Sequence, residues 1–416
     1  MIPAAACRAK LKSKQGKSMK QTDRYDIIII GAGASGLAAA IAALENGGSA
    51  QAEPEKARKV LVLERNGQPA RKILATGNGR CNYSNEASPY AQEVIAFLRE
   101  RCGIEPAEEE GRVYPRSMEA SSVAEALISC TKRLGAEIKC GAKAESVQKN
   151  AQGFVVKCED GSAFESEKLI LATGGKAGIQ YGCYGDGYGF AQALGHSVLK
   201  PIPALDGLCV EEDISDLHGV RAAAKASLFR VWSRSPADGT ADSEDLIARE
   251  FGEVQFTKNG ISGICVMDLS RYVRLSESGY YRLSLDFFPD ETAWALTEKL
   301  IQREQDFGCG LKWLLPEKLK DYLHTRLSAG RHGPEAMAEL AKDLSFSVMG
   351  TRGWKTAQVT CGGVPLDEVD PETFSSKLAG GLYLAGELLD YDGPCGGFNL
   401  SWAFHTGIRA GRAAAE

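Results

Sequence analysis

Three glycines near the start of the chain have the spacing G-x-G-x-x-G, at residues 31–36. Four consecutive isoleucines precede them and an alanine-rich segment follows, so the motif stands between a predicted strand and a predicted helix. In such a turn Gly31 permits the tight bend, Gly33 lets the backbone approach a pyrophosphate, and Gly36 lets the helix pack closely on the sheet. The helix N-terminus offers N–H groups and a partial positive charge to phosphates. The motif therefore predicts a dinucleotide-binding site, and a glycine turn without function is the alternative.

A carboxylate can complete this site. Glu64 closes the second predicted strand, residues 59–63, where an acidic side chain accepts hydrogen bonds from the ribose hydroxyls of an adenosine. The interval from the glycines is longer than the usual gap of about 20 residues, and the polar segment 46–58, which we expect to be a loop, accounts for the excess. An acid at this place disfavours the 2′-phosphate of NADP. FAD and NAD both remain, because the glycine motif cannot separate them.

The bulk composition is that of a globular protein large enough for two or three domains, with 416 residues, 44% of them hydrophobic and 25% charged. The net charge of −5 argues against a nucleic-acid binder, which is more often basic. The 12 cysteines include no C-x-x-C pair, and neither they nor the five histidines have metal-ligand spacing. We therefore expect reduced thiols in a cytoplasmic protein and no metal. No apolar run reaches the ~18 residues of a membrane span.

The elements that must position the glycine motif lie at both ends of the chain. Buried strands, glycine turns and helices alternate there, whereas the middle has short strand-like runs between polar turns, followed by two helical segments. We predict an α/β nucleotide-binding domain that is split by a β-rich and helical insertion. The expected parts are a basic, disordered tail over residues 1–23, the FAD- or NAD-binding domain over 24–200 and 350–416, and the insertion over 201–349. Translation from Met1 and from Met19 both remain open.

Several further segments resemble one known family of flavoproteins. These are residues 71–82 (RKILATGNGRCN), 111–115 (GRVYP), 172–175 (ATGG), 185–188 (GDGY), 360–364 (TCGGV), 376–377 (SK), 381–387 (GLYLAGE), 389–390 (LD) and 396–400 (GGFNL). Together they resemble the BaiN-like FAD flavoproteins, also called aminoacetone-oxidase-like or NAD(P)/FAD-dependent oxidoreductases, over residues 26–411. Four residues depart from the family's pattern, namely Thr76 for serine, Lys258 for histidine, Ile264 for proline and Phe398 for tyrosine. These departures bear on the substrate rather than on flavin binding.

The resemblance implies that the dinucleotide is FAD. It implies a Rossmann-type domain like that of glutathione reductase, with the insertion covering one face of the isoalloxazine ring and shaping the substrate pocket. It also implies the following cofactor-binding residues: Gly31, Gly33, Ala34, Ser35, Gly36, Glu64, Arg65, Lys72, Thr76, Gly77, Gly79, Arg80, Cys81, Asn82, Val147, Ala172, Thr173, Gly174, Gly175, Gly386, Glu387, Gly396, Gly397, Phe398 and Asn399.

The C-terminal segment agrees with an FAD site when its residues are considered alone. A predicted strand over 381–385 leads to Gly386 and Glu387, where a strand end can meet a ribityl chain. The glycine loop 393–397 lets the backbone approach a flat ring, and Asn399 is expected to cap a helix over 400–414. A helix N-terminus aimed at the flavin pyrimidine would stabilise negative charge near N1 of the reduced flavin. A helix that merely packs is the alternative.

Polar side chains beside these glycine segments are candidates for contact or chemistry. Lys72 and Arg80 can contact the FAD phosphates or a substrate anion, and ordinary surface charge is the alternative. Arg80 can lower the pKa of the adjacent Cys81 and make it a redox thiol, whereas a packing role is the alternative. Tyr391 and Asp392 stand just before the glycine loop, where they can face the flavin and donate a proton. They are the candidate catalytic residues.

A flavin that carries the hydride leaves few catalytic tasks to side chains. The resemblance implies a reductase of an activated C=C or C=O bond that uses NAD(P)H, or an oxidase of a small amine or ketone. No second G-x-G-x-x-G stands between a strand and a helix, so a nicotinamide donor would bind transiently. A flavin-dependent RNA-modifying enzyme and a non-catalytic flavin-binding protein are the alternatives. We expect a small-molecule substrate, no nucleic acid and no membrane, while substrate, electron donor and oligomeric state stay open.

Overall fold

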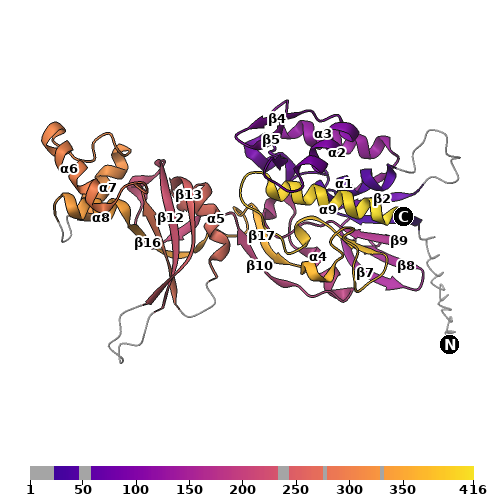
Figure 1. The fold of residues 1–416 in the computed structure, drawn as a ribbon. Coiled ribbons are helices and arrows are strands. Elements are labelled where there is room, and N and C mark those ends of the chain that lie inside the picture. Colours follow the sequence, from indigo (N-terminus) through magenta and orange to yellow (C-terminus); the bar gives the residue numbers. More distant parts are fainter. Residues whose placement is uncertain (1–22, 46–57, 233–242, 275–278, 328–331) are drawn as a thin grey trace, which may run out of the picture.

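The computed structural model describes residues 23–45, 58–232, 243–274, 279–327 and 332–416. Almost all of the predicted tail and of the predicted loop 46–58 lies outside these residues. Figure 1 shows two bodies side by side, a larger one built from both ends of the chain and a smaller one built from its middle. The larger body carries the glycine motif and both candidate catalytic residues.

A mostly parallel sheet is the centre of the larger body. Strands β6, β2, β1 and β9 follow one another in this order, and β18 pairs in parallel with the end of β9. The start of β9 pairs with β8, which pairs with β7, and both of these pairings are antiparallel. The strands are β1 Asp23–Ile30, β2 Val60–Glu64, β6 Glu137–Cys140, β7 Ala144–Asn150, β8 Gly153–Cys158, β9 Ala163–Leu171 and β18 Leu382–Leu384. The carboxyl ends of the parallel strands meet at one edge, where ligands bind in such sheets.

Helices cover this sheet and bring distant parts of the chain to the same edge. Residues 35–44 of α1 are all buried, and α9 from the C-terminus packs along α1. The helices of the larger body are α1 Ala34–Leu44, α2 Ala91–Cys102, α3 Ala120–Arg133, α4 Asp186–Ala193 and α9 Phe398–Ala414. A small antiparallel sheet of β3 Ser84–Asn85, β5 Arg112–Pro115 and β4 Pro106–Glu109 lies beside α2 and α9. Within the described residues, every helix is too short or too polar to cross a membrane.

The smaller body is a closed barrel with helices at its far end. Its strands, in order around the barrel, are β11 Leu208–Val210, β14 Gly260–Ser262, β13 Ser243–Thr257, β12 Arg221–Trp232, β15 Tyr280–Asp286 and β16 Leu344–Thr351. Its helices are α5 Ile264–Leu269, α6 Ala293–Phe307, α7 Glu317–Leu327 and α8 Pro334–Lys342. The pair β10 Leu199–Ala204 and β17 Val359–Gly363 stands where the chain leaves the larger body and returns to it. The predicted α/β fold with a β-rich and helical insertion is confirmed.

Several elements differ from the sequence prediction. Helices α4, α5 and α7 were not predicted, and β9 begins at Ala163, five residues before Lys168, where the sequence predicts the strand to start. Helix α9 begins at Phe398 rather than at Leu400, because Gly397 is its N-cap and takes a left-handed φ of 104°. In the described part of the chain, no group of three His, Cys, Asp or Glu side chains is placed to hold a metal ion.

Helices α1 and α9 touch through their backbones at two glycines. A Cβ atom added to Gly407 would overlap the carbonyl oxygen of Ser35, and one added to Gly411 would overlap that of Ala39. We therefore expect Gly407→Ala to lower the free energy of unfolding by about 3 kcal/mol, because a backbone oxygen cannot turn aside as a flexible side chain can. Urea unfolding of the purified variant measures this loss.

The matched control is Gly189→Ala on the exposed face of α4, where a Cβ atom would meet nothing within 4 Å. That variant is expected to gain about 0.5–1 kcal/mol, because alanine is the better helix former. Equal stability of the two variants would contradict the close approach of α1 and α9.

Candidate cofactor-binding and active site

The three motif glycines have different tasks in the fold. A Cβ atom on Gly31 would overlap the carbonyl oxygen of Ala172, the residue directly after β9, and the φ of Gly31 is 108°. A Cβ atom on Gly36 would overlap the carbonyl oxygen of Gly31 itself. Gly33 has an ordinary φ of −87°, and a Cβ atom there would meet nothing within 4 Å. Gly31 and Gly36 therefore permit the packing, while Gly33 leaves open space in front of the N-terminus of α1.

A cavity of about 650 Å³ extends from this open space to the barrel. It contains most of the residues that the sequence singled out. Those that line it are Gly31, Gly33, Ala34, Ser35, Glu64, Arg65, Lys72, Thr76, Gly77, Arg80, Asn82, Ala172, Thr173, Gly174, Glu387, Tyr391, Gly396, Gly397 and Asn399. The remaining candidates, Gly36, Gly79, Cys81, Val147, Gly175, Gly386, Asp392 and Phe398, do not border the cavity.

Glu64 is fixed at the carboxyl end of β2. Its side chain is buried, and Oε2 accepts a hydrogen bond from the backbone N–H of Ala32 inside the glycine motif, at 3.0 Å. Oε1 accepts from the backbone N–H and the side-chain amide of Asn66, at 2.8 and 2.7 Å. The carboxylate is therefore held beside the motif and at the cavity wall, where the hydroxyls of an adenosine ribose would reach it.

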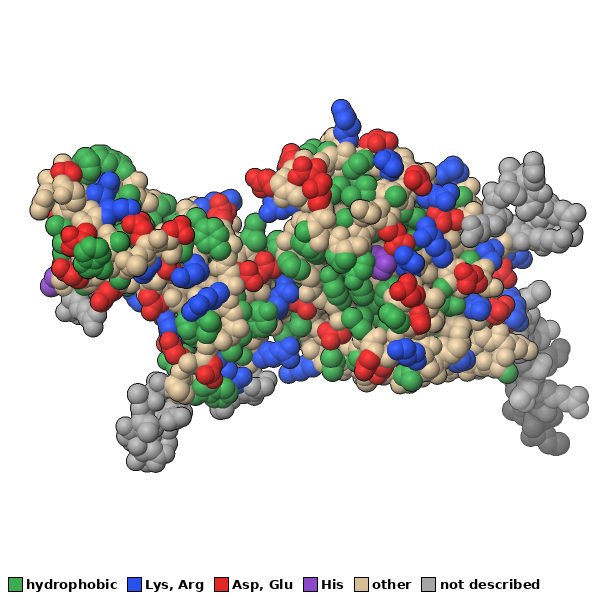
Figure 2. Space-filling view, viewed as in Figure 1, with side chains coloured by type: hydrophobic (Ala, Val, Ile, Leu, Met, Phe, Trp, Pro, Cys, Tyr) green, Lys and Arg blue, Asp and Glu red, His purple; other side chains and the backbone are tan. Residues whose placement is uncertain are grey.

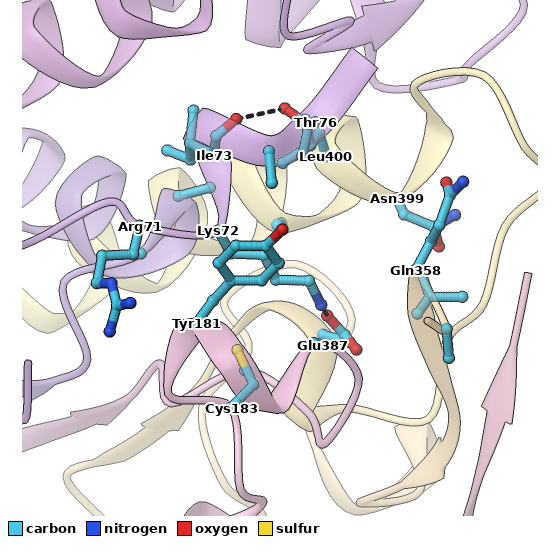
Figure 3. A pocket seen from close by; sticks show the side chains of 18 of the residues that line it. Arg71, Lys72, Ile73, Thr76, Tyr181, Cys183, Gln358, Glu387, Asn399 and Leu400 are labelled. Carbon is cyan, nitrogen blue, oxygen red and sulfur yellow. Dashed lines mark hydrogen bonds and ion pairs between the residues drawn. The ribbon is translucent and has the colours of Figure 1, made fainter. Parts of the chain in front are cut away.

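An ion pair stands in the middle of the cavity wall. Lys72 Nζ donates to Glu387 Oε2 at 2.7 Å, and Glu387 Oε1 accepts from the backbone N–H of Thr360 at 2.8 Å. Burial lowers the pKa of Lys72, but the Glu387 carboxylate more than offsets this and the net pKa is raised, so the ammonium stays charged. Figure 3 shows the Tyr181 ring and the Cys183 thiol beside this pair. Lys72 can therefore face an anionic or polar part of the cofactor without losing its charge.

The C-terminal loop closes the other end of the cavity. Asn399 was expected to cap the last helix, but that prediction is wrong, because Gly397 is the N-cap and Asn399 lies inside α9. The Asn399 side chain instead accepts from the N–H of Gly393 at 2.8 Å and donates to the carbonyl of Gly393 at 2.9 Å. Gly396 and Gly397, the two residues directly before α9, border the cavity as well. The N-terminus of a 17-residue helix thus faces the cavity at this end.

The two candidate catalytic residues point in different directions. The ring of Tyr391 lies on the ring of Trp402, with centroids 4.3 Å apart and an angle of 20°, and both residues border the cavity. Burial raises the pKa of Tyr391, so its hydroxyl stays protonated at neutral pH. Asp392 does not border the cavity, and its Oδ2 lies 3.2 Å from Nη1 of Arg271 in the insertion.

Arg80 does not activate the neighbouring thiol. Its guanidinium lies over the Tyr114 ring, 4.7 Å from the centroid, and donates to Glu109 at 3.0 Å. Cys81 is fully buried, and burial raises its pKa to about 11. The expectation that Arg80 lowers the pKa of Cys81 is therefore wrong, and the structure favours the packing alternative for this thiol.

Sequence reasoning missed the side chains that the insertion, two loops and helix α9 bring to the cavity. These include Tyr181, Cys183, Tyr184, Gln255, Met267, Lys355, Gln358 and Trp402. Ile264 also lines the cavity, on its insertion side, so together with Thr76 two of the four departures from the family pattern border it. The sequence signal for part of this wall is the segment 256–264 (FTKNGISGI), which contains the two departures Lys258 and Ile264.

The residues around the cavity fit FAD. The open space at Gly33 and the N-terminus of α1 suit a pyrophosphate, and Glu64 suits the ribose. Glu387 lies between this end and the C-terminal loop, where the ribityl chain would pass, and the N-terminus of α9 suits the electron-rich edge of a flavin. The cavity is long enough to join all of these places, so the chain offers one continuous site for the whole dinucleotide.

Comparisons with known proteins agree with this fit. The family model described as the HI0933-like protein Rossmann domain matches residues 87–413. The 3-dehydro-bile acid delta(4,6)-reductase of Clostridium scindens is 36% identical and covers 93% of this chain and 98% of its own. The ribosomal RNA dihydrouridine synthase of Escherichia coli is 26% identical and covers 92% of this chain and 96% of its own.

Among solved structures, the open conformation of a flavocytochrome c3 fumarate reductase covers 98% of this chain and 82% of its own, with a TM-score of 0.51 and 14% identity. That likeness shows the fold alone. The family match and the Clostridium scindens relative each cover most of the chain, and they confirm the resemblance to the BaiN-like flavoproteins. The chain belongs to the HI0933-like family of FAD-binding Rossmann proteins, and it is an FAD-dependent oxidoreductase.

Proposed function

We propose that this enzyme reduces a carbon–carbon double bond conjugated to a carbonyl group in a small molecule, with NAD(P)H as the electron donor. When bound, FAD would supply the chemistry of hydride transfer between a nicotinamide and the double bond. The chain has one G-x-G-x-x-G motif, which the FAD takes, so the nicotinamide binds only transiently.

The observation that carries this proposal is that one cavity is shared by the glycine motif, the C-terminal loop and the barrel. Gly33 borders it on the side of the nucleotide-binding domain, whereas Ile264 and Met267 of the insertion border it on the side of the barrel. These two side chains give the acceptor end an apolar surface, and pockets of this kind bury an apolar substrate while a few polar groups orient it. An enone with an apolar body fits this end of the cavity.

Reduction of such a bond needs a proton as well as a hydride. The hydride adds to one carbon of the double bond and the proton to the other, so that two hydrogens are added in all. Tyr391 suits the second task, because its hydroxyl stays protonated at neutral pH and its ring is stacked on Trp402 at the cavity. Tyr391 borders the cavity, so a substrate bound there can receive its proton. Asp392 is bound to Arg271, so we assign proton donation to Tyr391 alone.

The names of the relatives support this chemistry and leave two acceptor classes. The Clostridium scindens relative is named for the reduction of a bile acid, and those of Escherichia coli and Haemophilus influenzae for the formation of dihydrouridine in ribosomal RNA. Both reactions add two hydrogens across a double bond near a carbonyl group. A uridine in RNA is therefore the second candidate acceptor. The net charge of −5 disfavours it, and Figure 2 shows basic and acidic side chains interspersed over the visible face rather than one basic patch.

The test is anaerobic mixing of the FAD-loaded protein with NADH or NADPH, followed by an acceptor. We expect one of the two donors to bleach the visible flavin absorbance, and a bile acid with a 3-oxo-4-ene group to restore it. Free FAD with the same reagents is the control. If neither donor bleaches the flavin, the reductase proposal is wrong, and bleaching by aminoacetone alone would favour an oxidase. Recovery of the absorbance with ribosomal RNA but not with the enone would favour the RNA acceptor.

A further inference from the structure

The loop that closes the flavin end of the cavity, residues 392–397, is held from the insertion by two side chains, Arg271 and Asp268. We propose that Arg271 is a positioning residue of the active site. Together with Asp268 it fixes this loop, so the position of the barrel helps to set the shape of the cavity. Arg271 belongs to the short turn that follows α5, in the sequence between two barrel strands. The proposal does not depend on which acceptor the enzyme reduces.

The guanidinium of Arg271 binds two consecutive carbonyl groups of the loop. Nη1 donates to the carbonyl of Asp392 at 2.9 Å, and Nη2 donates to the carbonyl of Gly393 at 3.1 Å. The Arg271 side chain is only 16% exposed. Each of these bonds is therefore shielded from competing water, which makes its loss more costly than at a surface.

Two carboxylates complete the cluster around this guanidinium. Asp268 Oδ1 lies 3.2 Å from Nη2, and Asp392 Oδ2 lies 3.2 Å from Nη1. Asp268 Oδ1 also accepts the backbone N–H of Cys395 at 3.0 Å. Two side chains of the insertion thus bind three backbone groups within four residues of the loop.

The charges explain why an arginine stands here. Burial raises the pKa of Asp268 and of Asp392, and the guanidinium of Arg271 works against that rise in both. Without it, two buried carboxylates would lack their closest cation. A lysine keeps a positive charge but cannot present the planar fork that reaches two carbonyls and two carboxylates together.

The larger body holds the same loop from the opposite side. Asn399 on α9 binds both the N–H and the carbonyl of Gly393, the residue whose carbonyl Arg271 also binds. A Cβ atom on Gly397 would overlap the carbonyl of Ser84, so the end of the loop is packed against β3. Cys395 and Gly396 lie between these anchors and border the cavity. If Arg271 and Asp268 no longer bind the loop, the position of the part that faces the cofactor therefore changes.

The thiol of Cys395 reports on this hold, because it lies in the loop and is partly buried. We would compare Arg271→Gln and Arg271→Lys in the full-length protein, with and without added FAD, by timed alkylation with iodoacetamide and mass spectrometry of each cysteine. The matched control is Arg282→Gln, which removes an arginine bound to Glu244 and Asp343 within the insertion and away from the loop. Visible circular dichroism of the FAD-loaded protein reports on the surroundings of the flavin ring.

Arg271→Gln is expected to speed alkylation of Cys395 about tenfold, because the loss of one or two charge-assisted bonds to the loop exposes the thiol and outweighs the rise in its pKa when the nearby positive charge is removed. Arg271→Lys should show a smaller increase, and Arg282→Gln none. The visible circular dichroism should change in Arg271→Gln and stay as in the wild type in Arg282→Gln. The buried thiols of Cys81 and Cys158 should react equally slowly in all variants. An unchanged rate at Cys395 would overturn the proposal, and so would an equal rise at Cys81 and Cys158, which would mean general loss of folding.

Discussion

Replacing Gly33 with leucine is expected to give a folded protein that purifies without FAD. The backbone at Gly33 has φ −87° and ψ −164°, extended values that leucine adopts readily, and a Cβ atom there meets nothing within 4 Å. The fold therefore tolerates the side chain. The space that leucine enters is the cavity in front of the N-terminus of α1, where the pyrophosphate must approach the backbone. Flavin absorbance of the purified protein and titration of the apoprotein with FAD measure the effect.

The control for this prediction is Gly189→Leu, which adds the same side chain at another open glycine outside the cavity. That variant should purify yellow with the flavin content of the wild type. The thermal unfolding midpoints of the two apoproteins should be similar, which separates loss of the cofactor from loss of the fold. Full flavin occupancy in Gly33→Leu would mean that residues 31–36 are not the pyrophosphate site.

The nucleotide-binding half of the site could be predicted because its signals are short and local. Each signal lies within one turn or one strand: the isoleucines of β1, the glycines that follow them, and Glu64 at the end of β2. The glycines follow steric rules that hold in any surrounding, since Gly31 and Gly36 leave no room for a side chain. For this reason the parallel sheet and the open space at Gly33 could be predicted without knowing how the rest of the chain folds.

The insertion's share of the cavity could not be predicted in the same way. Alternating strands indicated a β-rich unit, but closure of the barrel rests on the pairing of β11 with β16, residues 208–210 with 348–351. No local pattern specifies such a distant pairing. The side chains of Gln255 and Met267 reach the cavity only because the two bodies meet there.

Neighbours in sequence proved to be poor guides to partners in space. Arg80 and Cys81 are adjacent, but Cys81 has a left-handed φ of 59° and is buried, while the Arg80 side chain lies on Tyr114. Tyr391 and Asp392 are also adjacent, yet the first faces Trp402 and the cavity and the second faces Arg271. Consecutive side chains leave an extended backbone on opposite sides, so a pair of candidates from sequence usually yields one residue at the site.

Tyr391→Phe is expected to slow reduction of the acceptor by about 10²- to 10⁴-fold, the usual contribution of a positioned acid. Phenylalanine keeps the ring on Trp402, 4.3 Å between centroids in the wild type, and removes only the proton donor. The measurement is the anaerobic reoxidation of the reduced flavin by an enone, followed in a stopped-flow instrument. Bleaching of the flavin by NAD(P)H is the internal reference, because that step needs no proton from the tyrosine.

The dependence on pH tests the same assignment in the wild type. Burial raises the pKa of Tyr391, so the donor keeps its proton above the ordinary tyrosine value of about 10. The rate of reoxidation should therefore stay level through pH 9 and fall only at still higher pH. The control is Tyr280→Phe, which removes a hydroxyl from an exposed ring on β15 outside the cavity and should leave the rate unchanged. If Tyr391→Phe reoxidises as fast as the wild type, the proton comes from another group, and the reason for placing Tyr391 rather than Asp392 at the reacting bond is lost.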